Sequence, residues 1–249
     1  MKIIVIIPAR FASTRFPGKP LALIGDKSMI RRVYERVRLS GIRDVYIATD
    51  DIRISDHVKE FNASVIMTSS SHTTGTERCA EAYQLIGQEY DVVINVQGDE
   101  PFIDPSQINL LAKAFEDDGV QIATLREKIE NAEDIENPNT IKVVGNHLNN
   151  AMFFSRSSIP FVRGKEKADW MKTTTFYKHL GIYAFRSSVL QEIVKLQSIQ
   201  IEAAESLEQL RWLYHGYTIK LLECKFSGIS IDSPEDLEKA NDILNNIYL

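Results

Sequence analysis

A basic loop follows the first apolar run of the chain. Residues 8–20 hold Arg10, Arg15 and Lys19 among small residues and prolines. Backbone N–H groups and cationic side chains in such a loop can cradle a triphosphate. The loop is neither a P-loop, because a proline follows Lys19, nor a GxGxxG dinucleotide fingerprint. A solvated basic loop is the alternative, but the position directly after an apolar run favours a phosphate site.

Two acidic positions fit a magnesium site. Asp99 lies in the segment Asn95–Pro101, directly after a fully apolar run, and Mg²⁺ typically takes one or two protein carboxylates together with phosphate oxygens and water. Asp99 could instead cap a loop. Asp232 precedes the start of the last predicted helix and could reach the same edge of a sheet. The alternative for Asp232 and Asp236 is a favourable interaction with the helix dipole alone.

The second half of the chain carries polar residues that suit a polyhydroxy acid. Arginine pairs well with a carboxylate, and His, Tyr, Glu and Gln side chains pair with hydroxyl groups. A single histidine is more often structural. The candidate residues are Arg156, His179, Tyr183, Glu208 and Gln209.

Alternating apolar runs and helical patterns must position these residues. Short apolar runs predict strands at 3–7, 44–48, 64–67 and 91–96. Helical spacing between them predicts helices at 29–39, 52–61 and 76–86. This alternation predicts an α/β fold with a mostly parallel sheet flanked by helices. Such sheets bind ligands beyond the carboxyl ends of their strands, where the basic loop and Asp99 lie.

The second half of the chain is less regular. A polar turn between 141–144 and 151–154 predicts a hairpin, and further strands are expected at 181–185 and 219–224. Helices are expected at 187–196 and 206–214. Ser233 as N-cap and Pro234 at the first helical position predict a last helix. No linker-like stretch divides the chain, so we expect one domain over 1–249.

Composition excludes several classes of protein. The net charge of −5 disfavours a nucleic-acid binder, which normally has a basic face. The apolar run at 3–7 is too short for a signal peptide or a membrane span, and we expect no membrane association. Cys79 and Cys224 have no metal-type spacing and fit a reducing compartment, which predicts a cytoplasmic protein.

The motifs resemble a known family over residues 6–237, nearly the whole chain. The segments IPARxxSTRxPGKP, NVQGDEP, HLGIY, LEQLR and D-x-PEDL occur in the order and spacing of the 3-deoxy-manno-octulosonate cytidylyltransferases, the CMP-Kdo synthetases of Gram-negative lipopolysaccharide synthesis. PGKP-type loops alone would indicate only the wider sugar-nucleotidyltransferases. Ser233, Phe11 and Phe16 depart from the usual residues, and residues 162–175 fit the pattern poorly.

The resemblance implies an architecture and a reaction. It implies a nucleotide-diphospho-sugar transferase-like core, a smaller sugar-binding and dimerisation insertion within 125–215, a homodimer and dependence on Mg²⁺. In the implied reaction, the anomeric hydroxyl of the eight-carbon acid sugar attacks the α-phosphorus of CTP in line, and pyrophosphate leaves.

The resemblance also implies site roles for particular residues. Arg10 and Lys19 bind the CTP phosphates and neutralise the leaving pyrophosphate, so that with Asp99 they form the expected catalytic group. Arg15 lies in the same loop. Asp99 and Asp232 hold the metal. The cytidine end is expected near Thr68, Gly75, Arg78 and Gln97. The sugar is expected to face Arg156, His179, Tyr183, Glu208 and Gln209.

The same motifs oppose several competing functions. A catalytically dead sugar-nucleotide sensor should have lost a metal carboxylate or the phosphate lysine, and this chain retains Asp99, Asp232 and Lys19. A Rossmann oxidoreductase is opposed by the missing glycine fingerprint. A sialic-acid cytidylyltransferase is opposed by the HLGIY and LEQLR segments. The 8-amino-8-deoxy analogue of the sugar differs by one group and stays open, as does the number of metal ions.

Overall fold

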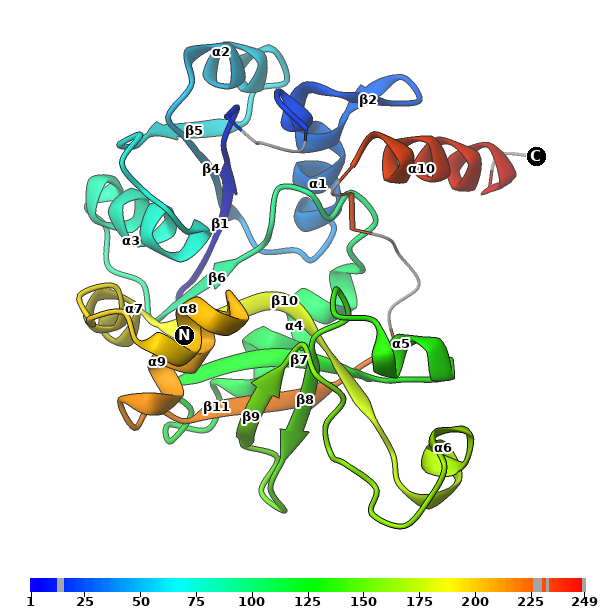
Figure 1. The fold of residues 1–249 in the computed structure, drawn as a ribbon. Helices are drawn as coiled ribbons and strands as arrows, with labels where there is room; N and C mark the ends of the chain where they lie inside the picture. Colours follow the sequence, from blue (N-terminus) through cyan, green and yellow to red (C-terminus); the bar gives the residue numbers. More distant parts are fainter. Residues whose placement is uncertain (13–15, 226–229, 232, 248–249) are drawn as a thin grey trace. The chain divides into compact units, whose positions relative to one another are not determined.

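The chain folds as two compact units, Met1–Ala112 with Phe226–Leu249 and Lys113–Lys225 (Figure 1). A computed structural model describes residues 1–12, 16–225, 230–231 and 233–247. The expectation of one domain with an insertion within 125–215 stays a prediction. Each unit is described by itself below.

A parallel sheet forms the centre of the first unit. Its four strands lie in the order β6, β1, β4 and β5, with every pair parallel. Residues Ile4 to Ile7 of β1 have no solvent exposure, as expected for a strand covered on both faces. The strands are β1 (Ile3–Ala9), β4 (Asp44–Thr49), β5 (Ser64–Met67) and β6 (Val92–Asn95). All four predicted strands are confirmed within three residues at each end.

Helices with well-made N-termini pack on this sheet. Ser28 and Asp51 cap α1 and α2, and Thr74 forms a capping box with Glu77 at the start of α3. These caps fix where each helix begins after its strand. The helices are α1 (Met29–Arg38), α2 (Ile52–Glu60), α3 (Gly75–Ile86), α4 (Pro105–Ala114) and α10 (Pro234–Ile247). The shorter elements are η1 (Lys19–Leu21), β2 (Leu23–Ile24) and β3 (Lys27–Ser28).

The C-terminal helix α10 belongs to the first unit, although it follows the second unit in sequence. The Ser233 hydroxyl accepts the Asp236 N–H at 3.3 Å, which confirms the predicted N-cap. Ala240 packs with Ile24, Met29 and Ile231 in a small buried cluster. This packing brings residues 230–231 back to the start of the chain.

The second unit is a mixed sheet. Strand β7 (Ile122–Lys128) lies between β10 (Tyr177–Arg186), which is antiparallel, and β11 (Ile219–Glu223), which is parallel. The predicted hairpin is confirmed as β8 (Lys142–Gly145) and β9 (Ala151–Ser155). Strand β10 begins four residues before the predicted start, so His179 lies inside a strand. Strand β7 was not predicted.

Short helices and one aromatic cluster complete the second unit. Trp170, Phe176 and Val162 are buried with Ile129 and Ile135, so part of the poorly matching stretch 162–175 is core. The helix predicted at 206–214 begins only at Gln209, because Ser206 has a left-handed backbone. The helices are α5 (Ala132–Glu136), η2 (Lys167–Asp169), α6 (Trp170–Thr173), α7 (Ser187–Ile193), α8 (Gln200–Glu205) and α9 (Gln209–Tyr214).

Candidate active site

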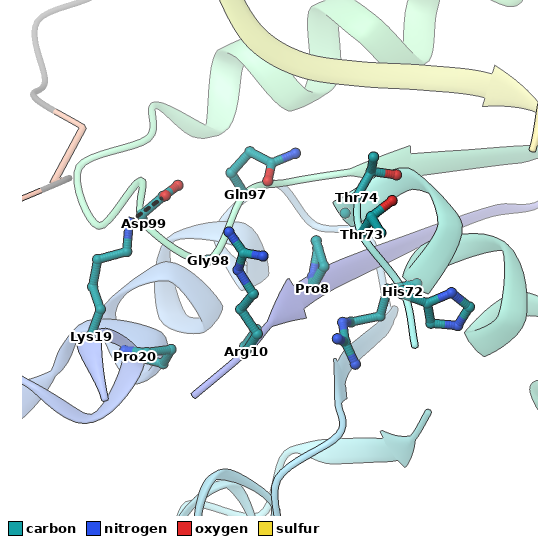
Figure 2. Close-up of a pocket in the computed structure, with 13 residues that line it drawn as sticks. Pro8, Arg10, Lys19, Pro20, His72, Thr73, Thr74, Gln97, Gly98 and Asp99 are labelled. Carbon is teal, nitrogen blue, oxygen red and sulfur yellow. Dashed lines mark hydrogen bonds and ion pairs between the residues drawn. The ribbon is translucent and has the colours of Figure 1, made fainter. Parts of the chain in front are cut away.

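A pocket of about 240 Å³ opens at the carboxyl ends of β1 and β6 in the first unit (Figure 2). The end of β1, the short helix η1, the N-terminus of α3 and the turn after β6 supply its walls. These segments are far apart in sequence and meet because parallel strands present their carboxyl ends at one edge. The lining residues are Pro8, Ala9, Arg10, Lys19, Pro20, His72, Thr73, Thr74, Gly75, Arg78, Gln97, Gly98 and Asp99.

Lys19 and Asp99 form an ion pair at one end of the pocket. The Lys19 Nζ donates to Asp99 Oδ2 at 2.7 Å and to the Ile231 carbonyl at 2.8 Å. The Ile231 N–H in turn donates to the Asp99 carbonyl at 3.1 Å. The ammonium predicted to bind the phosphates and the carboxylate predicted to hold the metal therefore lie together, beside the segment that precedes α10.

Arg10, the second cation predicted to bind the phosphates, projects from the end of β1 into the pocket opening (Figure 2) and is exposed. Its guanidinium is thus accessible to an anionic ligand. Arg15, like Asp232, lies outside the described residues.

The turn after β6 approaches β1 closely. A Cβ at Gly98 would lie 2.8 Å from the Pro8 carbonyl oxygen, closer than such atoms pack. Gly75 is also tight, because a Cβ there would lie 3.2 Å from the Pro8 ring and 3.3 Å from Gln97 Oε1. Small residues at these positions let the backbone form the pocket wall.

The basic loop is braced against α2. The Arg53 guanidinium lies over the Phe11 ring at 3.3 Å from its centroid, within range of a cation–π interaction. The Gly18 N–H donates to the Phe11 carbonyl at 2.9 Å, and Gly18 has a φ of 72°, which glycine adopts readily. Phe11, one of the departures from the family pattern, thus has a packing role.

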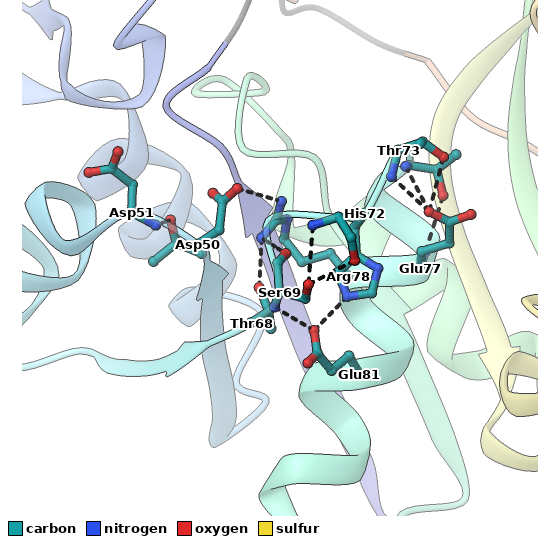
Figure 3. A network of polar contacts seen from close by, with 12 residues as sticks. Asp50, Asp51, Thr68, Ser69, His72, Thr73, Glu77, Arg78 and Glu81 are labelled. Atoms are coloured by element: carbon teal, nitrogen blue, oxygen red, sulfur yellow. Dashed lines mark hydrogen bonds and ion pairs between the residues drawn. The ribbon is translucent and has the colours of Figure 1, made fainter.

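A buried arginine, Arg78, also lines the pocket and belongs to a network of polar contacts (Figure 3). Arg78 is 3% exposed, and its Nη1 donates to Thr68 Oγ1 at 2.6 Å and to the Ser69 carbonyl at 3.4 Å. Its Nη2 lies 3.3 Å from Asp50 Oδ2. This network fixes the guanidinium, and through it Thr68, which does not line the pocket, contacts a residue that does. Sequence reasoning missed Asp50, although its place directly after β4 was a signal.

The loop before α3 carries a second missed residue, His72. Its Nε2 lies 2.5 Å from Glu81 Oε2, which also accepts the Ser69 N–H at 2.8 Å (Figure 3). Partial burial opposes ionisation of Glu81, but the hydrogen bonds from Ser69 and His72 outweigh it and lower the pKa of Glu81. The carboxylate therefore anchors this loop to α3.

The second unit brings together four of the predicted sugar residues, because Glu208 and Gln209 lie at the start of α9 and Trp212 of that helix packs against Tyr183 of β10. The His179 Nε2 lies 2.9 Å from Thr124 Oγ1, and the His179 and Tyr183 rings are 5.3 Å apart. Burial lowers the pKa of His179 to about 3, so the ring is neutral near pH 7. Burial, and then the charge of Glu208, raise the pKa of Tyr183.

Two buried polar atoms of this cluster lack partners. Among the described residues, neither Tyr183 Oη nor Gln209 Nε2 has a hydrogen bond, although each residue is only 3% exposed. An unsatisfied buried polar group typically costs about 1–3 kcal/mol. Polar groups of a ligand would remove that cost. Thr124, at the centre of the cluster, carried no sequence signal beyond a polar residue in an apolar run.

Arg156 has a different environment within the second unit. Its Nε donates to the Glu205 carbonyl at 2.7 Å, and its Nη1 donates to the Pro138 carbonyl at 2.9 Å. Its side chain thus ties the end of β9 to the last residue of α8 and to the loop after α5. The predicted role toward a sugar carboxylate stays a prediction.

The described residues contain neither a cluster of metal-ligating side chains nor a helix that could span a membrane. Among the described residues, no three His, Cys, Asp or Glu side chains gather as they would around a metal ion. None of the described helices is both long enough and apolar enough to cross a membrane.

Comparison with known proteins identifies the family. Residues 4–221 match a family model described as cytidylyltransferase. The 3-deoxy-manno-octulosonate cytidylyltransferases of Parabacteroides distasonis and Bacteroides thetaiotaomicron are 54% and 53% identical, each over 99% of both chains. A solved CMP:2-keto-3-deoxy-manno-octonic acid synthetase complexed with CTP superposes with a TM-score of 0.91 at 40% identity, over 99% of both chains. The chain therefore belongs to the 3-deoxy-manno-octulosonate cytidylyltransferase family.

Proposed function

We propose that this protein transfers the CMP group of CTP to 3-deoxy-D-manno-octulosonate and releases pyrophosphate. The observation that carries the proposal is the pocket in which Arg10, Lys19 and Asp99 meet at the ends of β1 and β6. The 40% identity and full-length superposition with a synthetase solved in complex with CTP support the choice of nucleotide. The named relatives support the choice of sugar.

Arg10 and Lys19 act on the triphosphate. In the proposed reaction the anomeric hydroxyl attacks the α-phosphorus in line, and negative charge builds on the leaving pyrophosphate. Preorganised cations in a partly buried pocket stabilise such charge. Lys19 is held at 2.7 Å from Asp99, so its ammonium is positioned before the nucleotide binds. Arg15 is proposed to assist from the same loop.

Asp99 fits a magnesium site. A cation, the Lys19 ammonium, already lies 2.7 Å from its Oδ2, so the pocket accommodates positive charge there. Mg²⁺ needs only one or two protein carboxylates when phosphate oxygens and water complete its coordination, and Asp232 is the proposed second ligand. When bound, Mg²⁺ would neutralise phosphate charge and lower the pKa of the attacking hydroxyl.

Arg78 defines the proposed cytidine end of the pocket. Its position is over-determined by Thr68, Ser69 and Asp50, so it presents donors without losing freedom on binding. A guanidinium offers donors to the carbonyl oxygen and ring nitrogen of a cytosine. Gly75 and Gln97 line the same pocket and are proposed to contact the nucleoside.

The second unit is proposed to read the sugar. Tyr183 and Gln209 hold buried polar atoms that hydroxyl groups would satisfy, and His179 and Glu208 belong to the same cluster. Arg156 is proposed to pair with the sugar carboxylate, because a buried carboxylate without a cation or several donors costs several kcal/mol.

The cellular setting follows the family. We propose a cytoplasmic homodimer that activates the sugar for lipopolysaccharide synthesis. Cys79 and Cys224 are thiols rather than halves of a disulfide, which fits a reducing compartment.

A panel of acid sugars tests the proposal. Pyrophosphate release would be measured with CTP and Mg²⁺ against 3-deoxy-D-manno-octulosonate, its 8-amino-8-deoxy analogue, sialic acid and a neutral aldose. We expect the highest kcat/KM for octulosonate and no reaction with the aldose, because sites built on hydrogen bonds reject ligands that lack the matching groups. A higher kcat/KM for sialic acid or the aldose would refute the proposed substrate.

A further inference from the structure

Strand β10 carries a bulge beside His179. Leu180 lies opposite Leu125 of β7, and the next paired residue of β10, Tyr183, lies opposite Thr124. Gly181 and Ile182 therefore have no counterparts on β7. A bulge of this kind disrupts the ladder locally and redirects nearby side chains.

The hydroxyl of Thr124 fills the gap that the bulge leaves. Thr124 has no solvent exposure, and its Oγ1 lies 2.7 Å from the Ile182 carbonyl oxygen and 3.2 Å from the Leu180 carbonyl oxygen. The third neighbour of Oγ1 is His179 Nε2 at 2.9 Å. One hydroxyl thus contacts both sides of the bulge and the imidazole.

Counting protons decides which of these groups donates. A threonine hydroxyl has a single proton, and a carbonyl oxygen can only accept. If the proton pointed to His179, both carbonyl oxygens would face a lone pair of the Thr124 oxygen. The proton must therefore point to a carbonyl oxygen, and that of Ile182 is the nearer. The Thr124 oxygen can then only accept from His179, so the proton of the imidazole lies on Nε2.

A neutral imidazole has one donor and one acceptor nitrogen. Burial lowers the pKa of His179 to about 3, so the ring carries a single proton at the pH of an enzyme assay. With that proton on Nε2, Nδ1 is left as an acceptor, and it has no hydrogen-bond partner among the residues that the structure describes. The His179 backbone is fixed as well, because its N–H donates to the Ile141 carbonyl at 2.8 Å.

We propose that Thr124 is a positioning residue that holds His179 in the Nε2–H tautomer, so that Nδ1 accepts a hydrogen bond from a hydroxyl group of the acid sugar. The second half of this statement rests on the proposed function. In this tautomer His179 adds a hydrogen-bond acceptor to the cluster. The Gln209 amide Nε2 can only donate, and the Tyr183 hydroxyl can donate or accept. A ligand hydroxyl facing His179 must therefore supply a proton.

Nitrogen NMR on the ligand-free protein tests the tautomer without any reaction. The protein would be labelled with ¹⁵N-histidine, and the His179 signals assigned by comparison with His179→Gln, since the chain has five histidines. We expect a protonated-type shift at Nε2 and an unprotonated-type shift at Nδ1, unchanged between pH 6 and 8. A proton on Nδ1, or titration of the ring in that range, would overturn the proposal.

Two substitutions of Thr124 test its effect on the sugar. Thr124→Val keeps the shape and removes the hydroxyl, whereas Thr124→Ser keeps the hydroxyl. We expect Thr124→Val to raise the sugar KM about tenfold, the equivalent of one hydrogen bond, with the CTP KM unchanged. Thr124→Ser should stay within about twofold of the wild type.

The outcomes separate this inference from the proposed function. Equal sugar KM values for Thr124→Val and wild type would overturn the role of Thr124. If Thr124→Val does not fold, the wild-type spectrum decides the tautomer, and an unaltered spectrum and sugar KM in Thr124→Ser support the role of the hydroxyl. A wild-type enzyme that does not consume octulosonate would refute the proposed function, whatever the position of the proton on His179.

Discussion

Asp99→Asn separates the structural from the catalytic role of the pocket carboxylate. The Lys19 and Asp99 side chains are 13% and 29% exposed and 2.7 Å apart. Two unit charges 4 Å apart attract each other by about 4 kcal/mol at an effective dielectric constant of 20. Desolvation of the two groups and the lost conformational freedom of their side chains largely offset this attraction. We expect a stability loss of only ~1 kcal/mol. The Lys19 ammonium keeps the Ile231 carbonyl as a partner at 2.8 Å.

The expected loss in turnover is larger. An Asn at this position keeps the shape of the side chain but removes the negative charge that we propose to bind Mg²⁺. Losing one preorganised electrostatic group typically costs ~10²-fold or more in kcat, or about 2.7 kcal/mol of transition-state stabilisation. The variant should therefore remain folded while its turnover collapses.

Pyrophosphate release at limiting and saturating Mg²⁺ measures the turnover, and thermal unfolding measures the stability. Asp56→Asn is the matched control, because Asp56 is 63% exposed and pairs with Lys59 on the surface of α2. The control should lose no turnover. A folded Asp99→Asn variant with near-normal turnover at limiting Mg²⁺ would refute the assignment of Asp99.

Three further predictions follow from individual contacts. In Arg78→Lys, the lysine cannot reproduce the guanidinium contacts of the buried Arg78, which is 3% exposed. We therefore expect the CTP KM to rise about tenfold or more with the sugar KM unchanged. Equal changes in both KM values would contradict the cytidine assignment. Gly98→Ala would place a Cβ 2.8 Å from the Pro8 carbonyl, so urea unfolding should report a stability loss of ~1–3 kcal/mol, and unaltered stability would disprove the close approach. Burial lowers the pKa of His179 from 6.5 to about 3, so below pH 6.5 the unfolded chain binds a proton that the folded protein does not, and stability falls by up to ~1.4 kcal/mol per pH unit. Urea unfolding at pH 7 and 5.5 should show a smaller loss for His179→Gln, and equal losses would contradict the burial of the ring.

The parallel half of the fold could be predicted because its signals are local. The apolar run at Ile4–Ile7 and the helical spacing over 76–86 each specify an element without reference to the rest of the chain. The basic loop could be located for the same reason, since its cations and glycine all lie within residues 8–20. These motifs also carried the resemblance from which the family was inferred and then confirmed by comparison.

The remaining features depend on contacts between distant residues. Strand β7 was missed, although Ile122 to Leu125 are buried, because nothing in its sequence indicates pairing with β10 and β11. The role of Thr124 depends on a bulge in β10, which appears only when two strands are paired in register. Asp50 becomes part of the site through Arg78, which lies on another element. Such residues have chemical meaning only after the chain has folded.

Following the label from two forms of radioactive CTP tests the central claim most directly. The protein would be incubated with Mg²⁺, octulosonate and either [α-³²P]CTP or [γ-³²P]CTP, and the products separated. Nucleotidyl transfer predicts that the α-label appears in a new compound that also contains the sugar, while the γ-label appears only in pyrophosphate. A γ-label on the sugar, or an α-label that remains in CTP or CDP in the presence of octulosonate, would contradict the proposed reaction.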